Sequence, residues 1–120
     1  MYQLEYKIPI YCGHYLKDSE SLTTKKCLKQ HGHEYRIEIN LMVDDKIKDG
    51  MVIDFGELKD IIMKYDHTNL NIFFENPTVE NFSKKLYDEI ITVLRKRCKN
   101  VSLKVKISES EKSSIIYYET

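Results

Sequence analysis

The feature that most constrains the fold is an alternation of apolar and polar residues in two long segments. In residues 2–14 the apolar side chains share one parity, and the segment from about His33 to Val43 repeats the pattern. A period of two residues is typical of a β-strand with one buried face. Pro9 is compatible with such a strand if the strand lies at a sheet edge or bulges there. The sequence therefore predicts two long strands in its first third.

The middle of the chain predicts two helices. The first covers residues 55–64, with Asp54 as its N-cap. Thr78 can cap the second helix, which ends near Lys99. Its apolar stripe has the spacing of an amphipathic helix and consists of Phe82, Leu86, Ile90, Val93 and Leu94. The intervening residues 65–77 are predicted to form an ordered loop.

Two further strands are predicted at the end of the chain. One covers about residues 101–107, and the other covers residues 114–118. The element order is strand, strand, helix, helix, strand, strand, and the connections favour antiparallel pairs. We therefore expect an α+β fold with a four-stranded antiparallel sheet and both helices on one face. A chain of 120 residues is expected to form a single domain, residues 1–120, because smaller pieces would bury too little core.

Composition excludes several classes of protein. Lys plus Arg and Asp plus Glu both number 19, so the basic excess of a nucleic-acid-binding protein is absent. The sequence contains no run of 18 apolar residues, which a membrane span would require. Its N-terminal segment also lacks the apolar core of a signal peptide. Three widely separated cysteines favour a reducing compartment over a disulfide scaffold. These features predict a cytoplasmic protein without a nucleic-acid or membrane partner.

Three histidines lie where the first two strands meet the loop between them. His14 continues the inward-facing series of the first strand, and His31 and His33 continue that of the second. If these strands pair antiparallel, the three imidazoles converge. Three nitrogen ligands leave a fourth tetrahedral position open, as in catalytic zinc sites. The pattern alone favours metal binding and ordinary core histidines about equally, and Cys12 on the same face is interpreted as a buried thiol.

Two groups near these histidines are candidates for proton transfer. Cys27 precedes His31 by four residues, and a thiol near a metal can become a thiolate base. Taken alone, a loop cysteine usually has no such role. Asp66 and His67 are adjacent, so a turn would allow the carboxylate to orient the imidazole for proton transfer. The alternative is that Asp66 only caps backbone amides.

Two glutamates are candidates for ligand binding. Glu109 continues the inward parity of the third predicted strand, where a carboxylate needs a partner. An amidine-like ring edge with two parallel donors would be such a partner. Alternatively, the strand ends at Ser108 and Glu109 is a solvated turn residue. Glu80 lies in the first turn of a predicted helix, where the helix dipole explains it without any function.

Several of these residues belong to six ordered segments that match a known family. The segments are GHYL (13–16), CLKQHGHEY (27–35), GMVIDFGELK (50–59), YDHTNLN (65–71), NPTVEN (76–81) and ISES (107–110). Over nearly its whole length the chain resembles the 6-pyruvoyltetrahydropterin and 6-carboxytetrahydropterin synthase family. Tyr15 departs from the basic residue that is usual there, which leaves open the residues that hold a triphosphate. Lys17, Lys25 and Lys26 are candidates for that role.

The resemblance implies a fold, an assembly and a set of site residues. The fold is the tunnelling fold, in which trimers close a barrel and two trimers form a homohexamer. The metal is Zn²⁺, and its implied ligands are His14, His31 and His33. The implied catalytic residues are Cys27, Asp66 and His67. The implied substrate-binding residues are Glu109, Thr78 and Glu80.

The resemblance also implies an activity. Three residues separate Cys27 from His31, and this short spacing is similar to the branch that serves queuosine biosynthesis. The implied enzyme is a lyase that converts 7,8-dihydroneopterin triphosphate to 6-carboxy-5,6,7,8-tetrahydropterin, with loss of acetaldehyde and triphosphate. One alternative is a 6-pyruvoyltetrahydropterin synthase. Another is a tunnelling-fold protein that binds a pterin or purine without catalysis.

Overall fold

The first two strands form one long antiparallel hairpin. A computed structural model describes residues 1–17 and 29–120, in which β1 (Tyr2–His14) pairs with β2 (His31–Val43) from end to end. Burial alternates along both strands, which confirms the predicted period. On its other side β1 pairs only at Cys12 and Gly13 within the described residues, so Pro9 lies at an open edge, one of the two placements that are compatible with it.

The sheet differs from the prediction in one respect. Its strand order is β3-β1-β2-β4-β5, with β4 (Val101–Ser108) and β5 (Ser114–Tyr118) antiparallel to their neighbours. The four predicted strands and their antiparallel pairing are confirmed, but the additional strand β3 (Thr68–Asn69) is parallel to β1, so the sheet is mixed and five-stranded rather than four-stranded. Two residues are too few to show a hydrophobic period, and their pairing depends on how the loop folds back.

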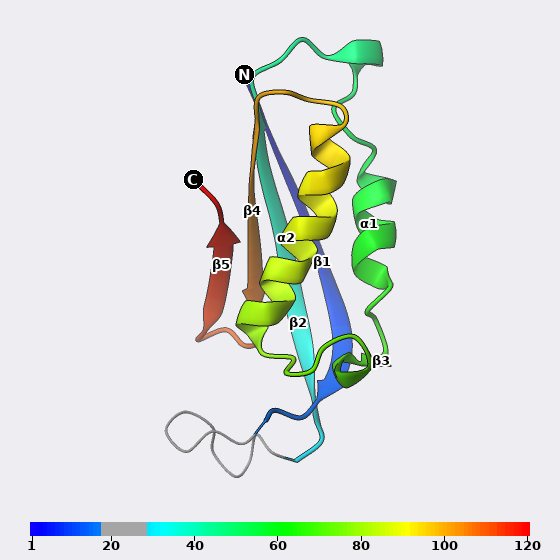
Figure 1. The fold of residues 1–120 in the computed structure, drawn as a ribbon, viewed down its shortest axis with the longest axis vertical. Coiled ribbons are helices and arrows are strands. Elements are labelled where there is room, and N and C mark those ends of the chain that lie inside the picture. The colour runs from blue at the N-terminus through cyan, green and yellow to red at the C-terminus, as the bar shows by residue number, and fades with distance from the viewer. Residues whose placement is uncertain (18–28) are drawn as a thin grey trace.

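Two helices cover one face of this sheet, as predicted (Figure 1). They are α1 (Phe55–Met63) and α2 (Val79–Arg95). Both predicted N-caps are confirmed: Asp54 accepts a hydrogen bond from the Gly56 amide, and Thr78 accepts one from the Asn81 amide. The stripe of α2 is buried against the sheet at Phe82, Leu86, Ile90 and Leu94. Burial of each such side chain contributes about 1.5–3 kcal/mol.

The segment between the helices passes along the end of the hairpin where β1 stops and β2 starts. It contains β3 and a short 3₁₀ turn, Leu70–Ile72, in which Leu70 is fully buried. This segment therefore contacts both the core and the end of the hairpin that carries the candidate histidines. Within the described part of the chain, no helix is long and apolar enough to cross a membrane.

Candidate metal centre and active site

The predicted convergence of three histidines is confirmed. His14 and His31 are opposite each other at the last pair of the β1–β2 ladder, and His33 lies two residues further along β2. Potential ligand atoms of the three side chains all lie within 4.8 Å of one another. His14 is buried, whereas His31 and His33 are half-buried. Strand register thus brings together three imidazoles from two segments that are distant in the sequence.

Two backbone carbonyls fix the tautomers of two of these rings. Nδ1 of His14 is 2.9 Å from the carbonyl oxygen of Pro77, and Nδ1 of His31 is 2.7 Å from that of Lys29. A carbonyl oxygen only accepts, so each Nδ1 carries the hydrogen and donates it. In the neutral rings Nε2 is then left with a free lone pair. Outer partners of this kind typically orient metal-binding histidines.

The two lone pairs point at each other. Nε2 of His14 and Nε2 of His31 are 2.9 Å apart, a separation at which unprotonated nitrogens repel unless a cation or a proton lies between them. Burial, with smaller contributions from His31 and His33, lowers the pKa of His14 and disfavours the proton. The donor set of three imidazoles therefore fits a divalent metal, and zinc matches imidazole ligands well.

Two contributors to this cluster are not evident from the sequence. The first is the Pro77 carbonyl, which comes from a different segment of the chain. The second is Tyr35, whose hydroxyl oxygen is 3.2 Å from Nδ1 of His14 and whose side chain is buried. Burial, and secondly the charge of Glu109, raises the pKa of Tyr35, so its hydroxyl stays protonated. Its inward parity on β2 predicts burial but not this contact.

The cysteines divide into two groups. Cys27, the candidate base, lies outside the described residues. Cys12 is buried as predicted, and its thiol donates a hydrogen bond to the carbonyl oxygen of Tyr65 at 3.1 Å. Burial, assisted by the charge of Asp66, raises the pKa of Cys12 to about 12. Cys12 is therefore a neutral thiol at pH 7 and does not compete for the role proposed for Cys27.

Asp66 and His67 form the predicted pair. Nδ1 of His67 is 2.8 Å from Oδ2 of Asp66, while Oδ1 of Asp66 accepts a hydrogen bond from the Tyr11 amide at 2.9 Å. The required turn is present, because His67 adopts a left-handed backbone conformation with φ of 56°. Asp66 thus binds a backbone amide and also holds the imidazole of His67.

This pair lies on the other side of β1 from the three histidines. The His67 ring is tilted against the ring of Tyr11, and Tyr11 is exposed on the face opposite that of His14. The His67 side chain is 77% exposed, so its second ring nitrogen is open to a ligand or to another subunit. The structure therefore does not place the Asp66–His67 pair in the histidine cluster of the same chain.

Asp66→Asn is expected to lower the free energy of unfolding at pH 7 by about 1 kcal/mol, because an amide binds the Tyr11 N–H less well than a carboxylate does. The Tyr11 amide and His67 lower the pKa of Asp66. This stability contribution is therefore present above the ordinary pKa near 3.8 and is lost as the pH falls through the lower folded value.

Urea unfolding at pH 7 and pH 3 tests this expectation. The difference between wild type and Asp66→Asn should shrink at pH 3. Asp45→Asn is the matched control, because Asp45 also accepts backbone amides, those of Lys99 and Asn100, at the other end of β2. A difference between wild type and Asp66→Asn that is as large at pH 3 as at pH 7 would contradict this expectation.

The three candidate ligand-binding residues are near one another. β4 ends at Ser108, one residue before Glu109, but Glu109 is half-buried rather than a fully solvated turn residue. Glu109 and Glu80 line the same cavity of about 240 Å³. Thr78 caps α2 two residues before Glu80 and does not line this cavity. Two carboxylates in one cavity suit a ligand edge that carries several N–H donors.

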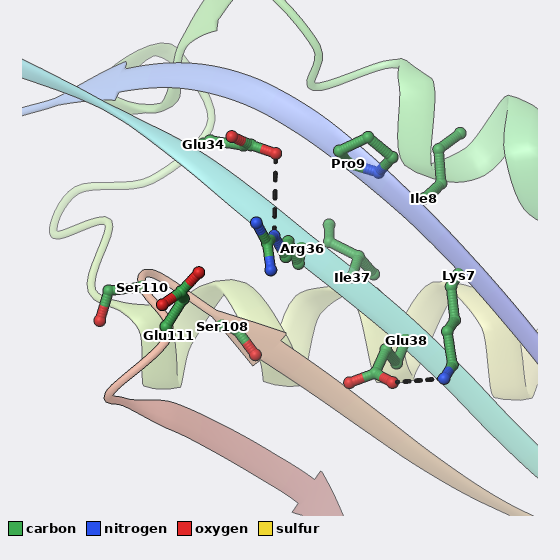
Figure 2. A pocket seen from close by; sticks show the side chains of 10 residues that line it. All are labelled: Lys7, Ile8, Pro9, Glu34, Arg36, Ile37, Glu38, Ser108, Ser110 and Glu111. Atoms are coloured by element: carbon green, nitrogen blue, oxygen red, sulfur yellow. Dashed lines mark ion pairs between the residues drawn. The ribbon is translucent and has the colours of Figure 1, made fainter.

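A more voluminous cavity than the one lined by Glu109 and Glu80 lies elsewhere. It measures about 520 Å³ and is on the sheet face opposite the helices (Figure 2). Its charged side chains pair with each other: Arg36 is 3.8 Å from Glu34, and Lys7 is 3.3 Å from Glu38. None of the candidate site residues lines it. The candidate metal centre formed by the histidine cluster is therefore separate from this charge-compensated cavity.

Comparison with protein families gives an independent result. The model of the family described as 6-pyruvoyl tetrahydropterin synthase matches residues 3–120. The chain belongs to this family. The histidine cluster is therefore the candidate metal centre of a member of the pterin synthase family.

Individual relatives of this pterin synthase family member carry more than one name. A protein of Archaeoglobus fulgidus named "Putative 6-carboxy-5,6,7,8-tetrahydropterin synthase" is 38% identical over 92 residues, which are 72% of this chain and 74% of the relative. A 6-pyruvoyl tetrahydrobiopterin synthase of Dictyostelium discoideum is 32% identical over 106 residues, 77% and 73% of the two chains. The solved 6-pyruvoyl tetrahydropterin synthase of Caenorhabditis elegans superposes with a TM-score of 0.71 at 26% identity, over 99% of this chain and 96% of that one.

Proposed function

We propose that this protein is a zinc-dependent 6-carboxy-5,6,7,8-tetrahydropterin synthase, a lyase of the cytoplasm that acts on 7,8-dihydroneopterin triphosphate. The observation that carries the proposal is the pair of facing Nε2 lone pairs of His14 and His31, within a chain of the pterin synthase family. The short spacing from Cys27 to His31 and the name of the Archaeoglobus relative favour the 6-carboxy product.

Each site residue has a defined task in this proposal. When bound, Zn²⁺ supplies Lewis acidity that lowers the pKa of a substrate hydroxyl. Its ligands would be His14, His31 and His33. Cys27 as a thiolate removes a proton from the substrate side chain, and His67, held by Asp66, returns a proton or accepts one from a hydroxyl. Glu109 accepts hydrogen bonds from the pterin ring edge in the cavity that Glu80 also lines, next to Thr78.

An assembly of subunits would complete the site. The free edge of β1 and the outer edge of β5 have no strand partners along most of their length in the described structure. Pairing of these edges between copies would remove both of them and close a barrel. A homotrimeric barrel, doubled to a hexamer, would also allow the exposed His67 of one subunit to approach the histidine cluster of another. Light scattering of the purified protein measures this assembly.

The decisive experiment is identification of the product. Purified protein loaded with zinc is incubated with 7,8-dihydroneopterin triphosphate, and the products are separated and identified by mass spectrometry. The proposal expects 6-carboxy-5,6,7,8-tetrahydropterin together with trapped acetaldehyde. Unchanged substrate would contradict the proposal and favour a protein that binds a pterin or purine without catalysis.

One observation favours a second candidate with the same site. The Dictyostelium relative is named a 6-pyruvoyl tetrahydrobiopterin synthase, and it matches a longer stretch of this chain than the Archaeoglobus relative does. A 6-pyruvoyltetrahydropterin product without acetaldehyde would assign this second function. The same incubation separates the two, because only the 6-carboxy reaction releases a two-carbon fragment.

Glu109→Gln is expected to raise KM for the pterin substrate by about 10-fold or more, because hydrogen bonds to a charged acceptor contribute about 1.5–3 kcal/mol. The change in kcat should be smaller, since Glu109 holds the ring and does not move a proton. Glu111→Gln is the matched control: Glu111 is exposed and lines the other cavity. Equal KM values for the wild type and Glu109→Gln would remove Glu109 from the substrate site.

A further inference from the structure

The two histidines that face each other lie at the end of the β1–β2 hairpin. His14 and His31 form the last pair of the β1–β2 ladder, and among the described residues no strand pairing continues beyond them. The terminal pairs of a hairpin open more readily than interior pairs. Ligands at such a position need an additional constraint if their ring nitrogens are to remain together.

Asn71 supplies that constraint on the β1 side. Its Oδ1 accepts a hydrogen bond from the Tyr15 amide at 2.9 Å, and its Nδ2 donates one to the Tyr15 carbonyl at 3.0 Å. Tyr15 directly follows His14, so both backbone polar groups after the ligand are held. The carboxamide of Asn71 thus replaces the strand partner that β1 lacks at this point.

Asn69 supplies a weaker constraint on the β2 side. Its Nδ2 donates to Oε1 of Gln30 at 3.3 Å, and Gln30 directly precedes His31. Oδ1 of Asn69 accepts a hydrogen bond from the Asn71 amide at 3.1 Å, which links the two arms. Gly13 leaves room for this arrangement, because a Cβ there would lie only 2.6 Å from Nε2 of Gln30.

The residue between the two asparagines anchors them. Leu70 is fully buried, so the tripeptide is fixed to the core while both carboxamides reach the end of the hairpin. The same segment continues to Pro77, whose carbonyl oxygen accepts the hydrogen bond from His14. One loop therefore holds both strands at the point where their pairing ends.

We propose that Asn69 and Asn71 form a clamp that positions His14 and His31 for metal binding. The inference rests on the proposed metal site and extends it to two residues that touch neither metal nor substrate. Their function is to keep the end of the hairpin closed, so that the two ring nitrogens stay together before the metal arrives. Such preorganisation raises metal affinity without adding a ligand.

The test is a titration of the full-length metal-free protein with Co²⁺, followed by its visible absorption spectrum, and competition with Zn²⁺. Asn71→Ala is expected to weaken Co²⁺ binding by about 10- to 100-fold, because it removes both hydrogen bonds that hold the backbone of Tyr15 next to His14. Gln30→Ala removes one exposed partner and is expected to weaken binding by at least about 2-fold. The matched control is Asn100→Ala, which breaks a hydrogen bond to Asp45 at the other end of β2 and should leave Co²⁺ affinity unchanged.

The outcomes separate the clamp from the proposed function. If the wild type binds Co²⁺ and Asn71→Ala binds it equally well, the clamp is overturned and the metal site stands. If the wild type binds neither ion, the proposed function fails first. Circular dichroism shows whether Asn71→Ala folds. If it does not fold, the Co²⁺ affinity of Gln30→Ala is the deciding measurement, and an unchanged Co²⁺ affinity in that variant overturns the proposal. Equal weakening in Asn100→Ala would show that general stability, not the clamp, governs metal binding.

Discussion

His31→Ala is expected to lose its metal, because a direct ligand is removed. Its metal affinity should fall by more than about 100-fold, which is the largest loss usually seen when only a residue that holds a ligand is removed. The reason lies in the geometry of the cluster. Nε2 of His31 is 2.9 Å from Nε2 of His14, and a backbone carbonyl holds Nδ1 of His31, so the ring presents Nε2 to the metal. The measurement is the metal content of protein purified with equimolar zinc, determined by mass spectrometry.

His67→Ala is the matched control for this variant. His67 is also a histidine, but it lies against Tyr11 on the other side of β1. The His67→Ala variant should retain zinc at the wild-type stoichiometry while losing turnover. Because His31 is only half-buried, His31→Ala should fold, and circular dichroism checks this. Stoichiometric zinc in His31→Ala would refute the assignment of the ligand.

The alternation of residues predicted the part of the site that depends on strand register. Parity placed His14, His31 and His33 on one face, and the pairing of β1 with β2 then brought them together. The same reasoning failed for β3, because a strand of two residues has no period. Register is encoded locally by the apolar pattern, so it could be predicted without knowledge of the rest of the fold.

Contacts made by the loop between the helices could not be predicted in this way. The carbonyl of Pro77, the left-handed conformation of His67 and the reach of Asn71 to Tyr15 all depend on where the loop lies over the hairpin. Backbone groups carry no signature in the sequence. The segment YDHTNLN (65–71) matched the family, but only the fold showed which groups its side chains bind.

Cys27→Ala is expected to lower turnover by about 10²–10⁴-fold, the range for a positioned proton-transfer group, while zinc stays bound. The other two cysteines provide the argument by elimination. Cys12 is buried and its pKa is raised to about 12, and burial also raises the pKa of Cys98. Neither is a thiolate at neutral pH, so the thiolate chemistry of this site, if a cysteine provides it, belongs to Cys27.

Two measurements make this prediction specific. Cys98→Ala is the matched control and should keep wild-type turnover, because Cys98 lies after α2, outside the histidine cluster. Iodoacetamide at pH 7 should modify Cys27 first, and inactivation should parallel that single modification. Full activity in Cys27→Ala, or inactivation that tracks labelling of Cys12 instead, would show that another group removes the proton.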